Sequence, residues 1–422
     1  MNIVGMKMER LMVIADDFTG ALDTGVQFAQ HGAITKVMTT ARSMDSSLNS
    51  EIQVIVVNSE TRHLSPEDAY KTVYRIASAG LRAGVGYFYK KTDSGLRGNI
   101  GAELSAVMDA VHADNLQFFP SFPKMNRTTV NGILNIDGLP VAESVFGKDL
   151  FEPVTKSSVK EIILSQTDKP VYEHTDVSTA DSREGIHVFD SRSDADLSDG
   201  GASLGKKGLY LSAGCAGFAP VLAGILGLHG SPLPVPKLEA KLMVVCGSLN
   251  PVTVQQVTEA EQSGMHRLTL SAEQKVNPEC FANDCGRLAE ECMEVLRQSG
   301  CCIVDVGDSD CSSAAQYVQK HNLTVHDLRM NIATSLGAMA RSVFDLGFDS
   351  TMMCIGGDTL QAIVEALGIF EITPICEIMQ GVPLSVINYK GKEYHLLTKS
   401  GGFGNPDLLR RLFAMMSSRR SA

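Results

Sequence analysis

Short apolar runs alternate with longer amphipathic segments along most of the chain. The first run, residues 11–15, precedes a segment whose apolar residues from 22 to 28 have helical spacing. The same reading predicts further strands at 35–38, 53–57, 86–89 and 116–119, and helices at 66–80 and 99–113. Strands that alternate with helices are typical of a parallel sheet with helices on both faces. The pattern therefore predicts an α/β fold.

The alternation is interrupted at residues 229–237, where prolines occupy positions 232, 234 and 236. Prolines at this spacing favour an extended linker over a helix. Beyond the linker we expect strands at 241–246, 267–270, 301–306 and 351–355, and helices at 251–264, 282–299, 327–346 and 356–367. A chain of 422 residues also exceeds one ordinary core. We predict two α/β domains, 1–230 and 238–422, each with a mostly parallel sheet flanked by helices, and a ligand cleft between them.

The composition narrows the functional class. The chain has 48 acidic and 37 basic side chains, a net charge of −11, which argues against a nucleic-acid or anionic-membrane binder. It has no apolar run near the roughly 18 residues that span a bilayer, and no signal peptide is apparent at its start. The ten cysteines include no C-x-x-C pair, so we expect reduced thiols. These features predict a cytoplasmic protein with small-molecule partners, and they leave a homo-oligomer open.

Against this acidic background, residues 90–101 form a cationic turn with the sequence KKTDSGLRGNIG. The turn lies between a predicted strand and a predicted helix. Glycines allow backbone N–H groups to approach a ligand closely, and a helix N-terminus favours negative charge. A solvated basic loop is the alternative interpretation. We predict a site for a small anion.

Other polar clusters also follow predicted strands, where ligands bind in parallel sheets. In the first half these are residues 16–20 and 58–62, which add carboxylates, hydroxyls and Arg62 to the cationic turn. In the second half they are residues 247–250, 356–359 and 400–405, which are rich in glycine and small hydroxyls, as a phosphate cradle requires. The first half thus predicts a site for an acidic polyol, and the second half predicts a nucleotide site.

Each cluster also has a purely structural interpretation. Asp16 and Asp17 follow a strand, so they can simply cap the next helix. Residues 356–359 and 400–402 can be tight turns before helices. Residues 200–206 imitate a Walker A motif, but Lys207 replaces its Ser/Thr, and an acidic segment at 194–199, which we interpret as a loop, precedes it in place of a strand. No G-x-G-x-x-G follows the first strand, which argues against a Rossmann dehydrogenase.

The motifs together resemble those of the four-carbon acid sugar kinases. The matching segments span the chain in order and read ADDFTGALD at 15–23, KTDSGLRGN at 91–99, GSLN at 247–250, GGDT at 356–359 and SGGFG at 400–404. The resemblance implies phosphorylation of D-threonate, D-erythronate or 3-oxo-tetronate at the 4-hydroxyl, with ATP as the cofactor. It is strongest to the members that act on D-threonate. It also implies that the first domain binds the sugar acid and the second binds ATP. Residues 126–204 match none of these motifs.

The resemblance also implies roles for individual residues. The sugar acid would be held by Asp16, Asp17, Arg62, Lys91, Thr92, Asp93, Ser94 and Arg97. The nucleotide would be held by Ser248, Gly356, Gly357, Asp358, Thr359, Gly401 and Gly402. We expect Arg62 and Lys91 to bind the C1 carboxylate. Asp358 is the first candidate for the general base or a Mg²⁺-linked carboxylate, and Asp17 is the second candidate for the base. Mg²⁺ is the expected metal, with its ligands unassigned.

Two rival functions remain at this point. A nicotinamide dehydrogenase acting on a sugar acid would also suit α/β domains with glycine turns, although its fingerprint is missing. A sugar-acid sensor or carrier without catalysis would need the anion site but not the second, glycine-rich set of turns. Consumption of ATP that depends on the sugar acid distinguishes a kinase from both.

Overall fold

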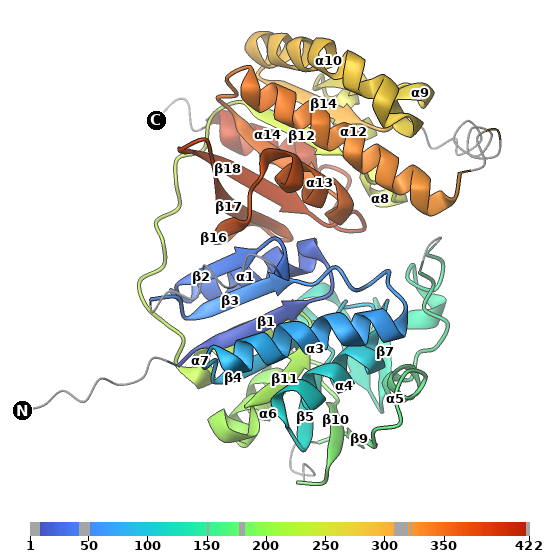
Figure 1. Cartoon of the computed structure of the whole chain (residues 1–422), viewed down its shortest axis with the longest axis vertical. Coiled ribbons are helices and arrows are strands. Elements are labelled where there is room, and N and C mark those ends of the chain that lie inside the picture. The colour runs from blue at the N-terminus through green and yellow to red at the C-terminus, as the bar shows by residue number, and fades with distance from the viewer. Residues whose placement is uncertain are drawn as a thin grey trace, which may run out of the picture. The chain divides into compact units, whose positions relative to one another are not determined.

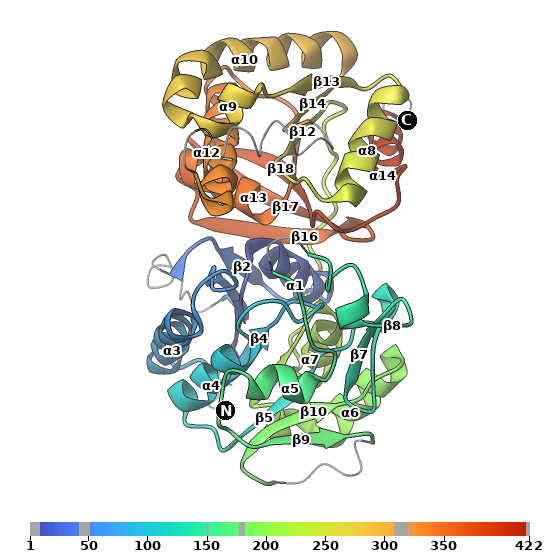
Figure 2. The same cartoon turned by 90° about the vertical axis from the view of Figure 1, so that its right-hand side faces the viewer.

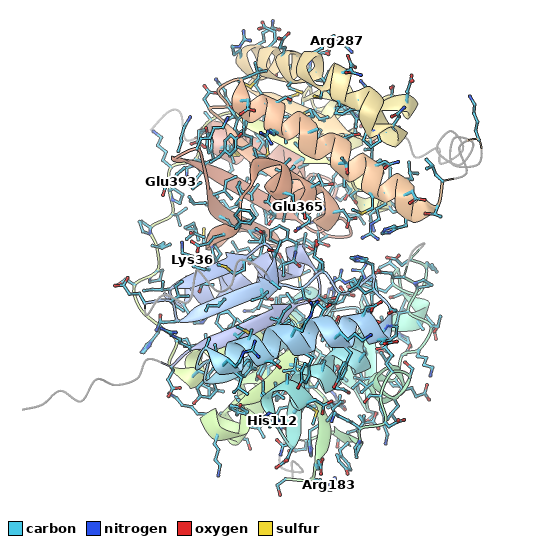
Figure 3. The ribbon with its side chains drawn as sticks, viewed as in Figure 1. Lys36, His112, Arg183, Arg287, Glu365 and Glu393 are labelled. Carbon is cyan, nitrogen blue, oxygen red and sulfur yellow. The ribbon has the colours of Figure 1, made fainter. Side chains whose placement is uncertain are left out.

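The computed structural model describes residues 9–41, 51–149, 152–176, 182–307, 320 and 323–418. The chain divides into two compact units, Met1–Leu233 and Pro234–Ala422 (Figure 1). Each unit has its own core of buried apolar side chains. Charged side chains such as Arg287 lie on the outside of the helical layers (Figure 3).

The first unit is built on a parallel sheet. Its strand order is β2-β3-β1-β4-β11-β5-β10-β9, and every neighbouring pair is parallel. The strands are β1 (Leu11–Ala15), β2 (Thr35–Met38), β3 (Val54–Asn58), β4 (Tyr87–Lys91), β5 (Asn115–Phe119), β9 (Val171–His174), β10 (Gly185–Phe189) and β11 (Leu211–Gly214). All residues of β1 and β3 are buried, which explains why these strands are continuous apolar runs rather than alternating ones.

Helices cover this sheet in two layers. One layer contains α1 (Phe18–Gln30), α6 (Asp194–Gly208) and α7 (Ala219–Leu226), in which α7 contacts both others. The other contains α3 (Pro66–Arg82), α4 (Ile100–Val111) and α5 (Val159–Leu164), in which α4 contacts both others (Figure 2). Ser65 caps α3 and Pro66 occupies its first turn, where the missing N–H costs nothing.

A small antiparallel sheet lies within residues 126–204, which match none of the family motifs. Its strands are β6 (Arg127–Val130), β7 (Ile133–Ile136) and β8 (Leu139–Pro140). The two turns are Asn131-Gly132 and Asp137-Gly138, and all four residues have positive φ angles. Asn-Gly and Asp-Gly are the dipeptides that favour such hairpin turns. The signal was therefore present in the sequence, although the strands are too short to show a period.

The acidic segment at 194–199, which we interpreted as a loop, is instead the start of α6. Ser193 caps this helix by accepting a hydrogen bond from the backbone N–H of Asp196, and the Asp196 side chain bonds back to the backbone N–H of Ser193. This capping box explains the error, because acidic residues in a first turn stabilise a helix. Residues 200–206 lie within α6, which is kinked at Gly205, and they do not follow a strand as a phosphate-binding loop would.

The second unit has a mixed sheet with strand order β13-β14-β12-β15-β18-β17-β16. Its first five strands are parallel, and β17 and β16 continue the sheet antiparallel. The strands are β12 (Leu242–Cys246), β13 (His266–Thr269), β14 (Cys301–Asp305), β15 (Thr351–Ile355), β16 (Glu371–Met379), β17 (Val382–Tyr389) and β18 (Lys392–Lys399). The strands β16, β17 and β18 form two consecutive hairpins.

Helices also flank this second sheet. The helices α10 (Pro278–Ser299), α12 (Val325–Asp345) and α13 (Gly357–Leu367) pack in sequence, with the short α9 (Ala272–Val276) beside α10 and α12. The helices α8 (Pro251–Gln262) and α14 (Leu408–Ser418) pack together on the other side (Figure 2). The prediction of two mostly parallel α/β sheets flanked by helices is confirmed. The cysteines in the described segments are free thiols, and no described helix is long and apolar enough to cross a membrane.

Candidate active site

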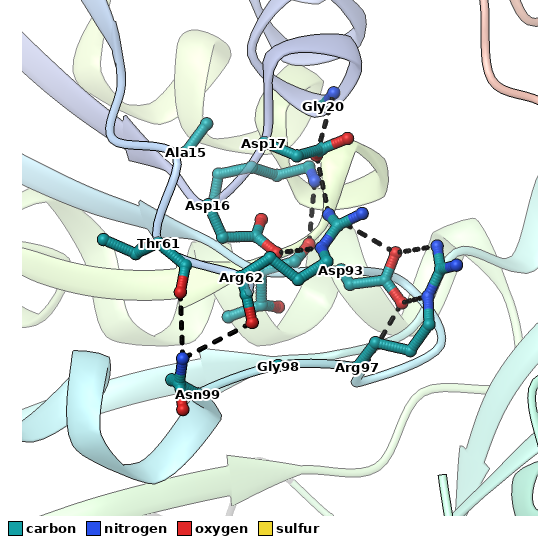
Figure 4. Close-up of polar contacts among 12 residues, drawn as sticks. Ala15, Asp16, Asp17, Gly20, Thr61, Arg62, Asp93, Arg97, Gly98 and Asn99 are labelled. Carbon is teal, nitrogen blue, oxygen red and sulfur yellow. Dashed lines mark hydrogen bonds and ion pairs between the residues drawn. The ribbon is translucent and has the colours of Figure 1, made fainter. Parts of the chain in front are cut away.

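Three polar motifs of the first unit meet at one edge of its sheet. The strands β3, β1 and β4 are neighbours, and Ala15 is paired with both Asn58 and Lys91 at their carboxyl ends. The residues that follow these strands therefore converge (Figure 4). The structure brings together the predicted substrate-binding residues Asp16, Asp17, Arg62, Lys91, Thr92, Asp93, Ser94 and Arg97.

Arg62 connects the three motifs. Its Nε donates to Asp16 Oδ2 at 2.7 Å, its Nη2 donates to Asp17 Oδ1 at 2.6 Å, and Asp93 Oδ1 lies 3.6 Å from Nη2. Burial opposes the charge of the guanidinium, but the attraction of Asp16, Asp17 and Asp93 outweighs it and holds the pKa of Arg62 well above its ordinary value. Arg62 is thus already bound to three carboxylates of the protein itself.

Asp17 is the N-cap of α1, as the structural interpretation predicts, but it does more than cap. Its Oδ1 accepts from the backbone N–H of Gly20 at 3.1 Å, and its Oδ2 accepts from Thr19 Oγ1 at 2.5 Å. Burial raises the pKa of Asp17, but the positive charges of Arg62 and Lys91 outweigh burial and lower it. The carboxylate is therefore held ionised at neutral pH.

Lys91 is buried beside the first turn of α1. Its Nζ donates to the backbone oxygen of Thr92 at 2.8 Å. A Cβ atom on Gly20 would lie 2.6 Å from Lys91 Nζ and 2.5 Å from Asp17 Oδ1, so any other residue here would displace these two groups. The neighbouring Lys90 is different, because its Nζ forms a fully buried ion pair with Glu103 Oε2 at 2.7 Å. Lys90 is therefore a core residue, although the sequence places it in the same cationic turn.

Asp93 and Arg97 fold the cationic turn onto itself. Asp93 accepts from the backbone N–H groups of Gly95 and Arg97 and from the Arg97 guanidinium, at 2.9–3.2 Å. Arg97 Nη1 also donates to Asp149 Oδ2 at 3.0 Å. Burial raises the pKa of Asp93, but Arg97 and Arg62 outweigh it and hold the pKa well below its ordinary value. The turn is therefore a rigid ion-pair network and not a solvated basic loop.

Replacing Asp93 with Asn should reveal this network in acid. The folded state holds the carboxylate ionised more strongly than the unfolded chain does. Its contribution to stability is therefore complete above the ordinary pKa of about 4 and is lost as the pH falls below it. We expect Asp93→Asn to lower stability at pH 7 by about 3 kcal/mol and to weaken the loss of stability in acid. Thermal unfolding between about pH 3 and 7 measures both, and parallel curves for the two proteins would contradict the network.

The three glycine-rich motifs of the second unit also converge. They follow β12, β15 and β18, which are neighbours in the sheet. A Cβ atom on Gly401 would lie 2.3 Å from Ser248 Oγ, and one on Gly247 would lie 2.2 Å from Thr359 Oγ1. These glycines are therefore required for the segments to approach one another. The structure brings together Ser248, Gly356, Gly357, Asp358, Thr359, Gly401 and Gly402 around the N-terminus of α13.

The first turn of α13 has the character of an anion site. Its N-cap is Gly356, with φ +107°, and no side chain caps the helix. Uncapped N–H groups and the helix dipole favour a phosphate at this position. Arg329 of α12 binds both oxygens of Asp358, through its Nε and through its Nη2, the latter at 3.1 Å. No motif indicated Arg329, because it lies inside an ordinary amphipathic helix.

Lys399 lies beneath the turn at 400–403. Like Arg329, it was not among the site residues that the sequence motifs indicated. Its side chain is fully buried, and its Nζ donates to the backbone oxygens of Ser400, Phe403 and Gly401 at 2.7, 2.8 and 3.3 Å. Thr253 Oγ1 is a fourth partner at 3.4 Å. Burial lowers the pKa of Lys399 to about 8. This buried cation holds the glycine turn in place.

Comparison with known proteins also divides the chain into two parts with different ligands. Residues 11–222 match the family model described as a sugar-binding N-terminal domain, and residues 243–409 match the one described as a nucleotide-binding C-terminal domain. A D-threonate kinase of Salmonella typhimurium is 29% identical over 95% of this chain and 96% of its own length. A D-erythronate kinase of Heliobacterium modesticaldum is 27% identical over 95% of both. A crystal structure from Salmonella typhimurium LT2 has the same fold, with a TM-score of 0.79 and 21% identity over 97% of this chain and 99% of that one.

The family models and the named relatives together identify the chain as a two-domain kinase of small molecules. The chain belongs to the four-carbon acid sugar kinase family. It is accordingly a phosphotransferase with an alcohol group as acceptor. The resemblance inferred from the sequence motifs is confirmed at the level of the family.

Proposed function

We propose that the protein phosphorylates the 4-hydroxyl of D-threonate with ATP, giving 4-phospho-D-threonate. The observation that carries this proposal is the presence, in one chain, of an ion-lined polar edge and a separate glycine-rich edge with an uncapped helix. D-threonate is preferred over D-erythronate and 3-oxo-tetronate because the D-threonate kinase has the higher identity of the two relatives described above. D-erythronate or 3-oxo-tetronate is the alternative acceptor.

The first unit supports the binding of an acidic polyol. Asp16 Oδ1 and Thr92 Oγ1 are buried and have no hydrogen-bond partner among the described residues. Unsatisfied buried polar atoms are costly, so a ligand that bonds to them gains affinity. A hydroxyl can donate to the Asp16 carboxylate and accept from the Thr92 hydroxyl. We infer that sugar hydroxyls occupy this edge, with Asp17 beside them.

The second unit supports the binding of a nucleoside triphosphate. The glycine contacts form a cradle that side chains would fill, and the first turn of α13 offers backbone donors. Mg²⁺ in kinases is bound by one or two carboxylates together with the phosphates. No cluster of three or more metal-ligating side chains occurs in the segments described here, and the Asp358 side chain, 38% exposed, fits this sparse role. When bound, Mg²⁺ would neutralise phosphate charge.

Both candidate bases are bound to an arginine, and they differ in the unit to which they belong. Both oxygens of Asp358 are bound to Arg329, on the nucleotide side. Asp17 lies on the sugar-acid side, with Lys91 and Arg62 beside it. The 4-hydroxyl that loses its proton belongs to the sugar acid. We therefore propose that Asp17, on the sugar-acid side, accepts this proton. Asp358 would then hold Arg329 and contribute a carboxylate to a bound Mg²⁺. This reverses the order in which the sequence motifs ranked the two residues.

Replacement of Asp358 with Asn separates these roles. We expect the KM for ATP to rise about tenfold, because the variant loses charge-assisted bonds worth about 1.5–3 kcal/mol. The value of kcat should stay within about tenfold of the wild type, whereas loss of a general base costs roughly 10²–10⁴ in rate. Steady-state kinetics with varied ATP and Mg²⁺ measure both constants. A fall in kcat beyond 10² with an unchanged KM would restore Asp358 as the base.

The function itself is tested by measuring ADP release from ATP in the presence of D-threonate, D-erythronate or 3-oxo-tetronate. We expect release to depend on the acid and to be fastest with D-threonate. Mass spectrometry of the product should show one added phosphoryl group. Binding of an acid without any ADP release would instead identify a sensor or carrier. Faster turnover of another acid would correct the acceptor and leave the class of reaction intact.

A further inference from the structure

The positive charges at the polar edge are not equivalent. Arg62 is bound to Asp16, Asp17 and Asp93, and Arg97 is bound to Asp93 and Asp149. Arg127, the first residue of β6, points to the same turn but forms no ion pair with any residue that the structure describes. A ligand carboxylate would have to displace a protein carboxylate to reach Arg62 or Arg97. It would not have to do so at Arg127.

The hydrogen bonds of Arg127 leave one edge of its guanidinium unused. Its Nη1 donates to Ser94 Oγ in the cationic turn. Its Nε is buried and has no hydrogen-bond partner in the described segments, and its Nη2 likewise makes no hydrogen bond there. The Nε–Nη2 edge of a guanidinium matches the two oxygens of a carboxylate, which it binds through two parallel hydrogen bonds. The unused edge is therefore suited to a carboxylate.

The surroundings of Arg127 fix its side chain. Its Cζ lies 5.1 Å from the centroid of the Phe146 ring, and Arg97 Cζ lies at the same distance from that centroid. Phe146 also packs against the turn, because a Cβ atom on Gly95 would lie 2.4 Å from its Cδ1. The aromatic ring thus orders both guanidinium groups beside the turn. A side chain held in this way loses little entropy when it binds a ligand.

The electrostatics distinguish Arg127 from its neighbours. Burial lowers the pKa of Arg127, and the attraction of Asp93 only partly compensates. For Arg62 and Arg97 burial acts in the same direction, but their bound carboxylates outweigh it and raise the pKa. Arg127 is thus a desolvated cation without an adequate counter-charge. An anionic ligand would supply one.

We propose that Arg127 binds the C1 carboxylate of the sugar acid through its Nε–Nη2 edge, and so selects acids over neutral polyols. This inference rests on the proposed function, from which it takes the acid. It gives the small sheet β6–β8 a role, because the sheet delivers Arg127 to the cationic turn. Arg62 then organises the acidic residues rather than binding the substrate carboxylate. With the C1 carboxylate bound to Arg127, the 4-hydroxyl at the other end of the acid remains free to react.

The test compares Arg127→Met and Arg127→Lys with the wild type. Isothermal titration of the full chain with the acid that the wild type binds best, among the three named above, measures affinity without catalysis. We expect Arg127→Met to weaken binding about 10- to 100-fold and Arg127→Lys to have an intermediate effect, because lysine keeps the charge but loses the two-pronged geometry. Arg75→Met, at an exposed position of α3, is the matched control and should bind normally.

Kinetics with the acid and with its neutral C1 amide give the second readout. We expect Arg127→Met to raise the KM for the acid with kcat nearly unchanged, and to remove the preference for acid over amide. Circular dichroism and thermal unfolding check that each variant is folded, and Arg127→Lys carries the test if the methionine variant is not. Unchanged affinity in a folded variant, or an equal loss with the amide, overturns the role of Arg127. Wild-type protein that binds an acid without phosphorylating it overturns only the kinase proposal, and failure to bind any of the acids overturns both.

Discussion

Asp17→Asn should lower kcat by roughly 10²–10⁴, the usual effect of removing a general base. The amide can no longer accept the proton of the 4-hydroxyl, yet it has nearly the shape of the carboxylate. Asparagine is as good an N-cap as aspartate, so α1 should keep its bond from the Gly20 N–H. The loss should therefore appear in kcat with little change in the KM for ATP. Steady-state kinetics with the preferred acid measure both.

The control is Asp68→Asn, because Asp68 also lies in the first turn of a helix in this unit but is exposed and bonds to Ser65. It should turn over at the wild-type rate. The ion pair of Asp17 with Arg62 is also lost in the variant, so thermal unfolding has to be recorded alongside the kinetics. A stable Asp17→Asn protein with kcat within threefold of the wild type would show that another group accepts the proton.

Lys399→Met should raise the KM for ATP by about 10- to 100-fold. Methionine has a similar length but donates no hydrogen bond, so three backbone oxygens of the turn at 400–403 lose their donor. A hydrogen bond to a charged group is worth about 1.5–3 kcal/mol, and each 1.4 kcal/mol is tenfold in affinity. The KM for the sugar acid should stay nearly constant. Lys392→Met, at an exposed position of the same strand, is the matched control.

The pH dependence of stability gives an independent check on Lys399. Its pKa of about 8 in the folded state lies below the ordinary value of 10.5, so the unfolded chain binds more protons between these two pH values. Wild-type stability should therefore gain a rising contribution from about pH 8 to 10.5, on the order of 3 kcal/mol. The Lys399→Met protein should lack this contribution. Denaturant unfolding across this range measures it, and identical slopes for both proteins would contradict the burial of a charged Lys399.

The sequence predicted the elements of both units because their strands are short buried apolar runs between amphipathic helices. The prediction was wrong or incomplete where a few neighbouring residues, rather than a periodic pattern, determine the structure. The acidic residues 194–199 predicted a loop, but Ser193 and Asp196 form a capping box that starts a helix. The small sheet at 127–140 has strands of two to four residues, and its hairpin dipeptides were the only pattern available.

The candidate site was predictable where its residues are adjacent in sequence to strand ends. The residues that the motifs did not reveal are those delivered from elsewhere by the fold. Arg127 comes from the small sheet, Asp149 from the segment that follows it, and Arg329 from the middle of α12. Lys399 was adjacent to a motif, but a lysine at a strand end gives no sign that it is buried. Contacts of this kind depend on side-chain geometry in the folded protein. The spacing of residues along the chain does not predict that geometry.

The central claim is that the first unit binds the sugar acid and the second binds the nucleotide. Hydrogen–deuterium exchange of the full chain, with D-threonate alone and with a non-hydrolysable ATP analogue alone, tests it most directly. We predict that the acid slows exchange at residues 16–20, 59–63 and 91–99, and that the nucleotide slows it at 247–253, 356–360 and 399–404. Nucleotide protection confined to the first set of segments, with the second set unchanged, would contradict the claim.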